Sequence, residues 1–551
     1  MRPGIAAARP WLFAIVILAA ALRFYPIWFG LPFGHARPDE TTALGLAAHI
    51  RGGDLNPHFF HWGSLTLYVF AAVHALASAL RRAFGLDPAL TFAELIVSAR
   101  AVIAFAGTLT VLVAYAMGRR MGTAVTGLLA ALFLAVAILH VRESHFAMTD
   151  ALMTFFVTAA LAALLEATAR SLAGSGATRW FLLAGAAGGL AASTKYSAAA
   201  IVAAMAVAQL LVLERARWRP LERAGWRALA LRSWLPSCAF LVAFAVGFVV
   251  GTPYAVLDFT QFQSDVRFDI AHLSRGHGID LGRGWAYHLT RSLPYGLGVP
   301  TFAAAVAGVA FTVRRNSRQA LVLWTFAAAL YASIGSGQTV FFRYVLPLLP
   351  PLCLSAAVAV EEVASWLATR ALITPSQATL ALVLIVASPA LVNSVWFDIV
   401  LSRTDSRVLA AQWLTPRLHT GDTLYDNGGS YAELDLTPAD IHHWQYDAAS
   451  ATFLNAGGRT PDWLVLHESP LNLPTHVSLV DLARSRYDLM YTVTASTEGA
   501  GTSVYDRQDA FFMPITGFAS IERPGPTIRV YRRRDAQALL SAGGASSDTS
   551  R

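Results

Sequence analysis

Two short acidic motifs stand at the ends of hydrophobic segments, where carboxylates could carry out chemistry. The first, Asp39-Glu40, follows the first hydrophobic segment, and the second ends the stretch RESHFAMTD at Asp150. Carboxylates at a membrane boundary are costly unless they are solvated, paired or used. If both motifs lie on the same side of the membrane, they could share one site in which a carboxylate acts as a general base.

The first motif also has a structural interpretation. Pro38 favours the first position of a helix, and the helix dipole stabilises acidic residues in the first turn. Gly52-Gly53 would then end that helix. The sequence alone does not decide between a helix start and a general base.

The second motif has local alternatives as well. Arg142 and Glu143 could form a local ion pair, and Thr149 or Asp150 could cap the helix that follows. His145 in the same stretch is more typical of a loop histidine than of a ligand. These interpretations predict a structural role for each residue beside the functional one.

Two basic residues lie at the predicted outer ends of later segments. Lys195 and Tyr196 occur in STKYSA, and Arg343 and Tyr344 occur in GQTVFFRYVLP. Both cations could simply extend toward the interface. Cations at that depth also suit a lipid phosphate.

His58 and His61 could ligate a metal together with Asp39 or Glu40, although two histidines with nearby acids form a weak pattern. The sequence requires no cofactor, and it leaves open whether a divalent metal is needed.

The composition indicates a membrane protein. Of 551 residues, 55% are hydrophobic and only 14% are charged, which is unlike a soluble domain of this size. We predict a transmembrane module at 1–397, an extracytoplasmic soluble α/β domain at 398–535 and a disordered tail at 536–551.

The net charge of +8 is explained by basic loops and does not indicate nucleic-acid binding. Cys238 and Cys353 lie in apolar segments and predict neither a disulfide framework nor a metal site.

The basic connections predict the topology. Apolar segments occur near 11–30, 62–80, 94–117, 122–140, 150–169, 180–194, 196–213, 234–252, 293–313, 319–335, 342–360 and 378–397. Arginine-rich connections at 119–120, 214–232 and 314–318 are predicted to be cytoplasmic. The loops at 31–61, 141–149 and 253–292 then lie outside. Because the loop at 31–61 and the start of segment 94–117 both lie outside, segment 62–80 cannot cross the membrane once. It should lie in the membrane–water interface or re-enter. This leaves eleven spans, with the N-terminus inside and the C-terminus outside.

The order of motifs resembles a known superfamily. The motifs, in chain order, are the Asp-Glu pair, NPHFFHWGSLTLY, ARAVIAFAGTLTVLVAYAMGRRMG, RESHFAMTD, STKYSA and FRYVLPLLPP. Over roughly residues 10–360 they resemble the GT-C glycosyltransferases. The pattern is most similar to the family 39 group of protein-mannosyltransferase-like enzymes, which shares its layout with the lipid A aminoarabinose transferases.

The resemblance implies transfer of a sugar from a polyprenyl-phosphate donor to a lipid, glycan or protein acceptor. It implies inversion at the sugar, on the outer face of the bacterial inner (plasma) membrane. Asp39 matches the catalytic acid of the first outer loop, Glu40 is its neighbour, and Asp150 matches the acid of the second loop. The cations expected to hold the donor phosphate are Lys195, Arg343 and Arg142.

A transporter or lipid flippase is the main alternative. Such proteins place charges within spans near the midplane, often in repeated halves. Here the charges cluster at the ends of segments. Release of free polyprenyl phosphate from a sugar-linked donor would distinguish the two functions.

The C-terminal region is predicted to be a small α/β unit. RVLAAQWL suits a helix, and DTLYDN, DWLVLHES, YDLMYTVTA and TIRVYRR suit strands separated by turn residues.

Overall fold

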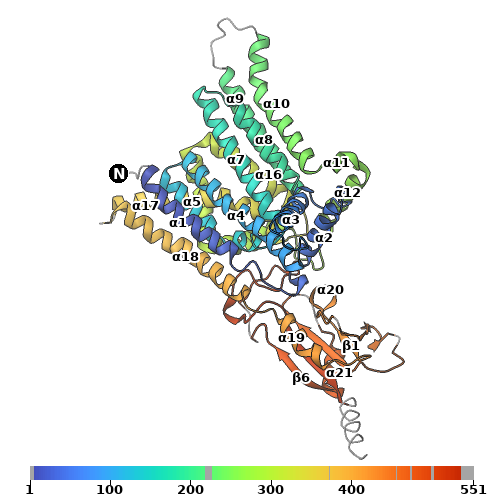
Figure 1. Cartoon of the computed structure of the whole chain (residues 1–551). Helices are drawn as coiled ribbons and strands as arrows, with labels where there is room; N and C mark the ends of the chain where they lie inside the picture. Colours follow the sequence, from blue (N-terminus) through green and yellow to red (C-terminus); the bar gives the residue numbers. More distant parts are fainter. Residues whose placement is uncertain are drawn as a thin grey trace, which may run out of the picture. The chain divides into compact units, whose positions relative to one another are not determined.

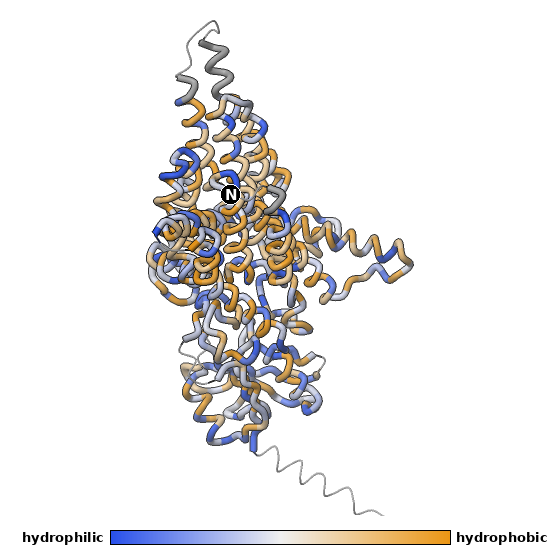
Figure 2. The backbone as a smooth tube through the Cα atoms, turned by 90° about the vertical axis from the view of Figure 1, so that its left-hand side faces the viewer, coloured by the Kyte–Doolittle hydropathy of each residue, from blue (hydrophilic) through white to orange (hydrophobic). Residues whose placement is uncertain are grey.

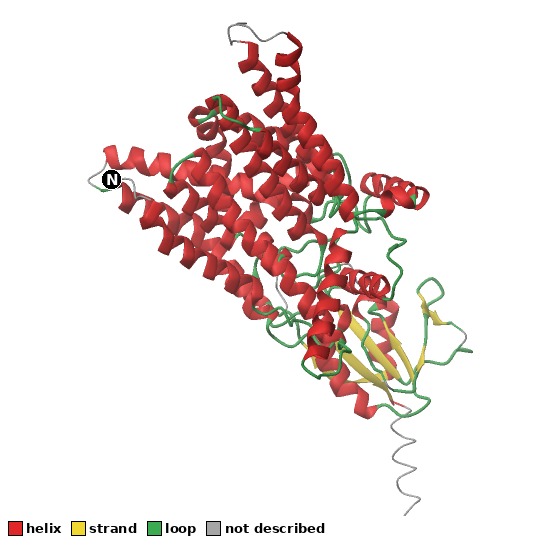
Figure 3. Ribbon diagram, turned by 45° about the horizontal axis from the view of Figure 1, so that its top comes forward, coloured by secondary structure: helices red, strands yellow, loops and turns green. Residues whose placement is uncertain are grey.

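A computed structural model describes residues 5–217, 226–370, 373–437, 439–454, 456–471, 475–497 and 502–534. The predicted tail at 536–551 and the middle of the basic connection at 214–232 lie outside the described residues. The chain forms two compact units, one made of Met1–Ile27 with Thr42–Phe397 and the other of Trp28–Thr41 with Asp398–Arg551. The sequence assigned Trp28–Thr41 to the membrane module, whereas the structure packs this segment with the C-terminal residues. Figure 3 shows helices throughout the first unit and strands in the second.

The helical part of the chain runs to residue 401. Its helices are α1 (Ile5–Phe24), α2 (Pro38–Arg51), α3 (Leu65–Ala83), α4 (Phe92–Met121), α5 (Ala124–Val136), α6 (Ile138–Glu143), α7 (Thr149–Ala173), α8 (Thr178–Ala192), α9 (Ile201–Arg217), α10 (Trp226–Gly251), α11 (Tyr254–Leu257), α12 (Phe259–Arg275), α13 (Gly284–Tyr287), α14 (Leu293–Leu297), α15 (Val299–Arg315), α16 (Ser317–Gly335), α17 (Leu349–Arg370) and α18 (Pro375–Leu401). Short helical turns are η1 (Gly34–Ala36), η2 (Tyr196–Ala200), η3 (His288–Ser292) and η4 (Phe342–Leu348).

Within the described residues, six helices are long and apolar enough to cross a membrane. They are Phe92–Met121, Thr149–Ala173, Tyr196–Glu214, Trp234–Gly251, Phe342–Arg370 and Pro375–Arg417. Figure 2 shows many hydrophobic residues along the helical part of the chain. The chain is therefore a multi-pass membrane protein, while the eleven-span topology stays a prediction.

Several predicted segments are not among the six helices. They are covered by α3 at 62–80 and by α1, α5, α8 and α16. The predicted span at 293–313 is broken, because Gly284–Leu297 and Val299–Arg315 meet at an angle of 115°. Gly298 stands at the break with φ +86°, a backbone conformation that glycine adopts without strain. Pro294, Gly296, Gly298 and Pro300 were a local signal of this bend that a reading by hydropathy passed over.

Helices α8 and α10 pack closely in the first unit (Figure 1). A Cβ atom on Gly185 would lie 2.2 Å from the backbone oxygen of Phe240, and one on Gly189 would lie 2.1 Å from that of Phe244. The two glycines are one turn apart, so they form a smooth strip on α8. Small residues at such positions allow helix backbones to approach closely in a membrane.

The second unit contains a five-stranded sheet with the order β2-β1-β5-β7-β6. Strand β1 pairs in parallel with β2 and β5, whereas β7 pairs antiparallel with β5 and β6. The elements are α19 (Ser406–Leu414), η5 (Thr415–Arg417), β1 (Thr423–Asp426), α20 (Gly429–Ala432), β2 (His442–His443), β3 (Tyr446–Asp447), β4 (Thr452–Phe453), β5 (Trp463–Glu468), α21 (Val477–Arg486), β6 (Tyr487–Val493), η6 (Phe518–Ser520) and β7 (Thr527–Arg533). The predicted helix and all four predicted strands are confirmed.

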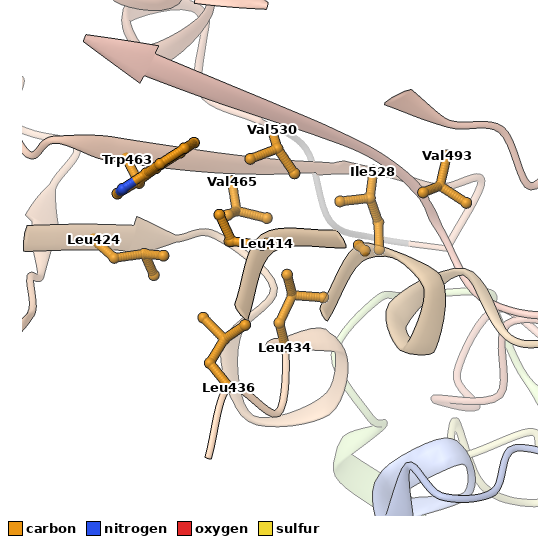
Figure 4. Packing of buried hydrophobic residues seen from close by; sticks show 10 residues of the cluster. Leu414, Leu424, Leu434, Leu436, Trp463, Val465, Val493, Ile528 and Val530 are labelled. Atoms are coloured by element: carbon orange, nitrogen blue, oxygen red, sulfur yellow. The ribbon is translucent and has the colours of Figure 1, made fainter. Parts of the chain in front are cut away.

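Strand β5 divides the core of this unit between its two faces. Trp463 and Val465 pack with Leu414 of α19 in one cluster, as Figure 4 shows. Leu464 and Leu466 pack in a second cluster. Successive side chains of a strand point to opposite faces, so a strand buried on both sides reads as a continuous apolar run.

The segment Trp28–Thr41 is anchored in the second unit by side-chain contacts. Phe29 packs edge-on against Phe511 with ring centroids 5.9 Å apart. The guanidinium of Arg407 lies 4.4 Å from the ring centroid of Phe33. A buried ion pair joins Arg37 to a carboxylate near the C-terminus, described below. These contacts fix the loop that carries the first acidic motif.

Candidate active site

The first acidic motif begins helix α2, as the structural interpretation predicted. Asp39 and Glu40 lie in its first turn. Glu40 is buried, whereas 41% of the Asp39 side chain is exposed. Arg37 lies just before the helix, with its Nη2 atom 3.8 Å from Asp39, and it forms an ion pair with buried Asp509. Of the two acids, Asp39 is therefore the one exposed to solvent.

The second acidic motif lies in the first unit, close to two other predicted site residues, Lys195 and Tyr344. Lys195 Nζ donates to Asp150 Oδ1 at 2.7 Å. The same ammonium lies 4.9 Å from the ring centroid of Tyr344. Asp150 is 1% exposed and Lys195 is 23% exposed. Three elements therefore meet here, namely the start of α7, the connection between α8 and η2, and the turn η4.

The expectation that Asp150 or Thr149 caps the helix is wrong. Helix α7 begins at Thr149 after Met148, and no side chain accepts a hydrogen bond at that cap. The carboxylate of Asp150 turns toward Lys195 instead, so it belongs to an ion pair between distant elements.

The other two predicted cations differ in accessibility. Arg343 is half-buried, and its guanidinium lies 4.0 Å from the ring centroid of Phe341. Arg142 is fully buried beside Glu143, its predicted partner. Arg142 is therefore a buried, paired cation, and its role toward a donor phosphate stays a prediction.

His145 occupies a structural position. Its Nδ1 lies 2.9 Å from the carbonyl oxygen of Val141, and its Nε2 lies 3.0 Å from that of Tyr25. Burial lowers the pKa of His145 to about 4, so the ring is neutral near pH 7. The residue links the second loop to the end of α1.

The NPHFFHWG stretch is attached to α12 and to η2. Phe60 N donates to Asp265 Oδ2 at 2.8 Å, and Tyr196 Oη donates to Phe60 O at 3.0 Å. His61 Nδ1 lies 3.0 Å from Asp269 Oδ1. That hydrogen bond raises the pKa of His61. Tyr196 and His61 therefore position this loop.

The predicted metal ligands are arranged differently from the expectation. His61 pairs with Asp269, whereas His58 approaches Asp54, which His49 also approaches. Asp39 and Glu40 belong to the second compact unit, and His58 and His61 belong to the first. The predicted set of His58 and His61 with Asp39 or Glu40 would span both units and stays a prediction.

Sequence reasoning missed several of these partners. The carboxylates of Asp265 and Asp269 are one helical turn apart on α12, a spacing that sequence could have revealed. No local pattern links Arg37 to Asp509. One further signal was available, because Lys195 is the single lysine among the 42 lysine and arginine residues of the sequence. A chain that uses arginine everywhere else has lysine where a compact ammonium meets Asp150.

Known proteins match part or all of this chain. Residues 85–258 match the family described as dolichyl-phosphate-mannose-protein mannosyltransferase. No curated protein sequence matches. The apo oligosaccharyltransferase of Archaeoglobus fulgidus is similar over 96% of this chain and 88% of that chain, with 11% identity and a TM-score of 0.53.

Two further structures are similar with lower scores. ArnT from Cupriavidus metallidurans bound to undecaprenyl phosphate matches 96% of this chain and 97% of that chain, with 16% identity and a TM-score of 0.46. The Archaeoglobus fulgidus oligosaccharyltransferase tethered with an acceptor peptide matches 76% of this chain, with 16% identity and a TM-score of 0.47. That match spans 61% of the relative's length. The chain is thus similar to the mannosyltransferase family over residues 85–258, and it shares the fold of the apo oligosaccharyltransferase.

Proposed function

We propose that the chain transfers a sugar from a polyprenyl-phosphate donor to an acceptor on the extracytoplasmic face of a bacterial inner membrane. The observation that carries the proposal is the family match over 85–258, because its description names a dolichyl-phosphate sugar and a protein acceptor. The matched stretch contains both Asp150 and Lys195. For this chain, the proposed acceptor is a hydroxyl of a lipid, glycan or protein.

The proposed reaction is one inverting displacement. The acceptor oxygen attacks the anomeric carbon from the face opposite the phosphate, and the bond between that carbon and the phosphate oxygen breaks. Asp39 takes the acceptor proton as general base. The polyprenyl phosphate leaves with the bonding electrons, and cations stabilise its growing charge. The step needs no oxidant, reductant or further reactant.

Lys195 is the proposed principal cation for the leaving phosphate. An ammonium has three N–H donors, and Asp150 accepts from one of them at 2.7 Å. The ring of Tyr344 lies beside the same group. Lys195 remains partly exposed, so its other donors can reach phosphate oxygens. Asp150 is then a positioning residue, and Arg343 is a second cation for the phosphate.

The proposal is tested by measuring release of free polyprenyl phosphate from a panel of polyprenyl-phosphate sugars. Purified full-length protein would be combined with membrane extract from a deletion strain as the acceptor source. Asp39→Asn should lower turnover by about two or more orders of magnitude, because the proton acceptor is lost. A transporter would move the donor without releasing polyprenyl phosphate.

Asp87→Asn is the matched control, since Asp87 is an exposed acid in the loop between α3 and α4 whose Oδ1 accepts from Ala89 N. Its turnover should equal that of the unaltered protein. Near-normal turnover in Asp39→Asn, or an equal loss in both variants, would contradict the assignment of Asp39.

A further inference from the structure

Three side chains at the end of α2 converge outside the proposed catalytic groups. His49 Nε2 lies 3.2 Å from Asp54 Oδ2, and His58 Nε2 lies 3.1 Å from the same oxygen. The three ligand atoms all lie within 4.8 Å of one another. All three side chains are exposed. Two imidazole nitrogens and one carboxylate oxygen therefore face a common point that solvent can reach.

The geometry points to a Zn²⁺ site formed by His49, Asp54 and His58. Ligands bound at 2.0–2.1 Å around a tetrahedral zinc ion are separated by about 3.3 Å. The two nitrogen-to-oxygen distances, 3.2 and 3.1 Å, are already close to that separation. Closing the site needs the two histidine nitrogens to approach each other. Water can fill the fourth position because the cluster is open.

The loop between the ligands holds its shape through its own side chains. Asp54 Oδ1 accepts from Asn56 N at 2.9 Å, and Asn56 Oδ1 accepts from His58 N at 3.1 Å. His58 has φ +49°, in the left-handed region that a non-glycine residue seldom adopts. With this backbone conformation, His58 Nε2 lies 3.1 Å from Asp54 Oδ2.

A further carboxylate is available behind His58. Asp258 Oδ2 lies 3.7 Å from His58 Nδ1, and Asn56 Nδ2 donates to Asp258 Oδ2 at 2.9 Å. A histidine that binds a cation through Nε2 carries its proton on Nδ1, which usually meets a carboxylate or a carbonyl. His58 Nδ1 faces the Asn56 amide nitrogen at 3.1 Å in this structure, so zinc binding requires this amide to move before Asp258 accepts the Nδ1 proton. The ligand set favours zinc over calcium or magnesium, because those ions prefer oxygen ligands.

A bound ion would join the last turn of α2 to the loop that leads into the NPHFFHWG stretch. The first turn of the same helix carries Asp39. The site would therefore fix the far end of the helix on which the proposed base is mounted. The inference concerns binding of a cation and does not depend on the transferase activity.

The test is calorimetric titration of ZnCl₂ into full-length protein in detergent, after EDTA treatment and purification through a tag without histidine. We expect one zinc site that is absent or weakened by about 100-fold or more in His49→Gln and in His58→Gln. Asp258→Asn should weaken binding by about 10-fold. Titration with CaCl₂ should show no tight binding.

Two matched histidine variants serve as controls. His419→Gln changes an exposed histidine of the second unit whose Nδ1 lies 3.7 Å from Asp422 Oδ2. His272→Gln removes one member of a second histidine pair, in which His272 Nε2 lies 3.3 Å from His277 Nδ1. Both controls should retain the site. The inference is overturned if the unaltered protein shows no zinc binding below 100 µM, or if His272→Gln abolishes binding while His49→Gln does not. Equal melting temperatures of all variants in EDTA would show that each one folds.

Discussion

Breaking the ion pair between Lys195 and Asp150 should destabilise the first unit by an amount that depends on which partner is removed. Lys195→Met leaves a carboxylate that is 1% exposed without its cation, whereas Asp150→Asn leaves a cation that is 23% exposed. Removing one partner of a buried pair costs about 3–5 kcal/mol. We therefore expect a loss near 3 kcal/mol for Lys195→Met, at the lower end because of the exposed fraction. We expect about 1–2 kcal/mol for Asp150→Asn, whose remaining charge keeps contact with solvent.

The double variant, Lys195→Met with Asp150→Asn, separates the interaction free energy of the ion pair from the separate effect of each substitution. With both charges removed, no uncompensated charge remains, so the double variant should be more stable than Lys195→Met alone. The coupling free energy of the cycle should then be about 1.5–3 kcal/mol. The assay is unfolding of purified protein in mixed micelles, followed by tryptophan fluorescence as the denaturing detergent is increased. Lys195→Arg is the matched control that keeps the positive charge.

The reasoning is refuted if the single losses add within about 0.5 kcal/mol in the double variant, since independent sites behave in this way. It is also refuted if Asp150→Asn costs more than Lys195→Met.

Lysine-specific chemistry gives a separate readout of the same group. Because Lys195 is the single lysine of the sequence, an amine reagent modifies it and the chain's N-terminus alone. Donor lipid should protect Lys195 from that reagent if its ammonium meets the phosphate.

Three further outcomes follow from the structure. The Asp269 hydrogen bond raises the pKa of His61, so protonated His61 should stabilise the fold fully below about pH 6.5. This stabilisation should be lost as pH rises through the raised pKa. Melting temperatures measured against pH should show the loss, and a parallel profile in His61→Gln would contradict it. Gly189→Val should separate α8 from α10, because its Cβ would lie 2.1 Å from Phe244 O; unchanged thermal stability would count against that close contact. Arg37→Met removes the cation that pairs with buried Asp509 and should destabilise the packing of Trp28–Thr41, measurable as loss of protease resistance in that segment; resistance equal to that of the unaltered protein would argue otherwise.

The elements that sequence predicted well are those whose pattern is local. The runs at β1, β5, β6 and β7 combine apolar residues with flanking turn residues, and each forms a strand where expected. Helix α2 starts at Pro38 and ends before Gly52-Gly53 because both boundaries are chemical features of a few adjacent residues.

The features that sequence did not predict depend on distant partners. Aspartate is a common helix cap, and only the approach of Lys195, 45 positions away, gives Asp150 another role. The strands β2, β3 and β4 have only two residues each, too few for a periodic pattern. The grouping of His49 with Asp54 and His58 arises where the chain turns after a helix, and helical spacing does not describe it.

The ion pair between Arg37 and Asp509 also sets an order of events during synthesis. The two residues are 472 positions apart, which corresponds to roughly 25–95 s of translation at about 5–20 residues per second. Throughout that interval the Asp509 carboxylate is not yet available to the guanidinium. The segment Trp28–Thr41, although made early, can therefore reach its final packing only after nearly the whole chain has left the ribosome. A chain that stops short would carry Asp39 on an unfinished loop, so the proposed catalytic base would be assembled last and only in a full-length protein.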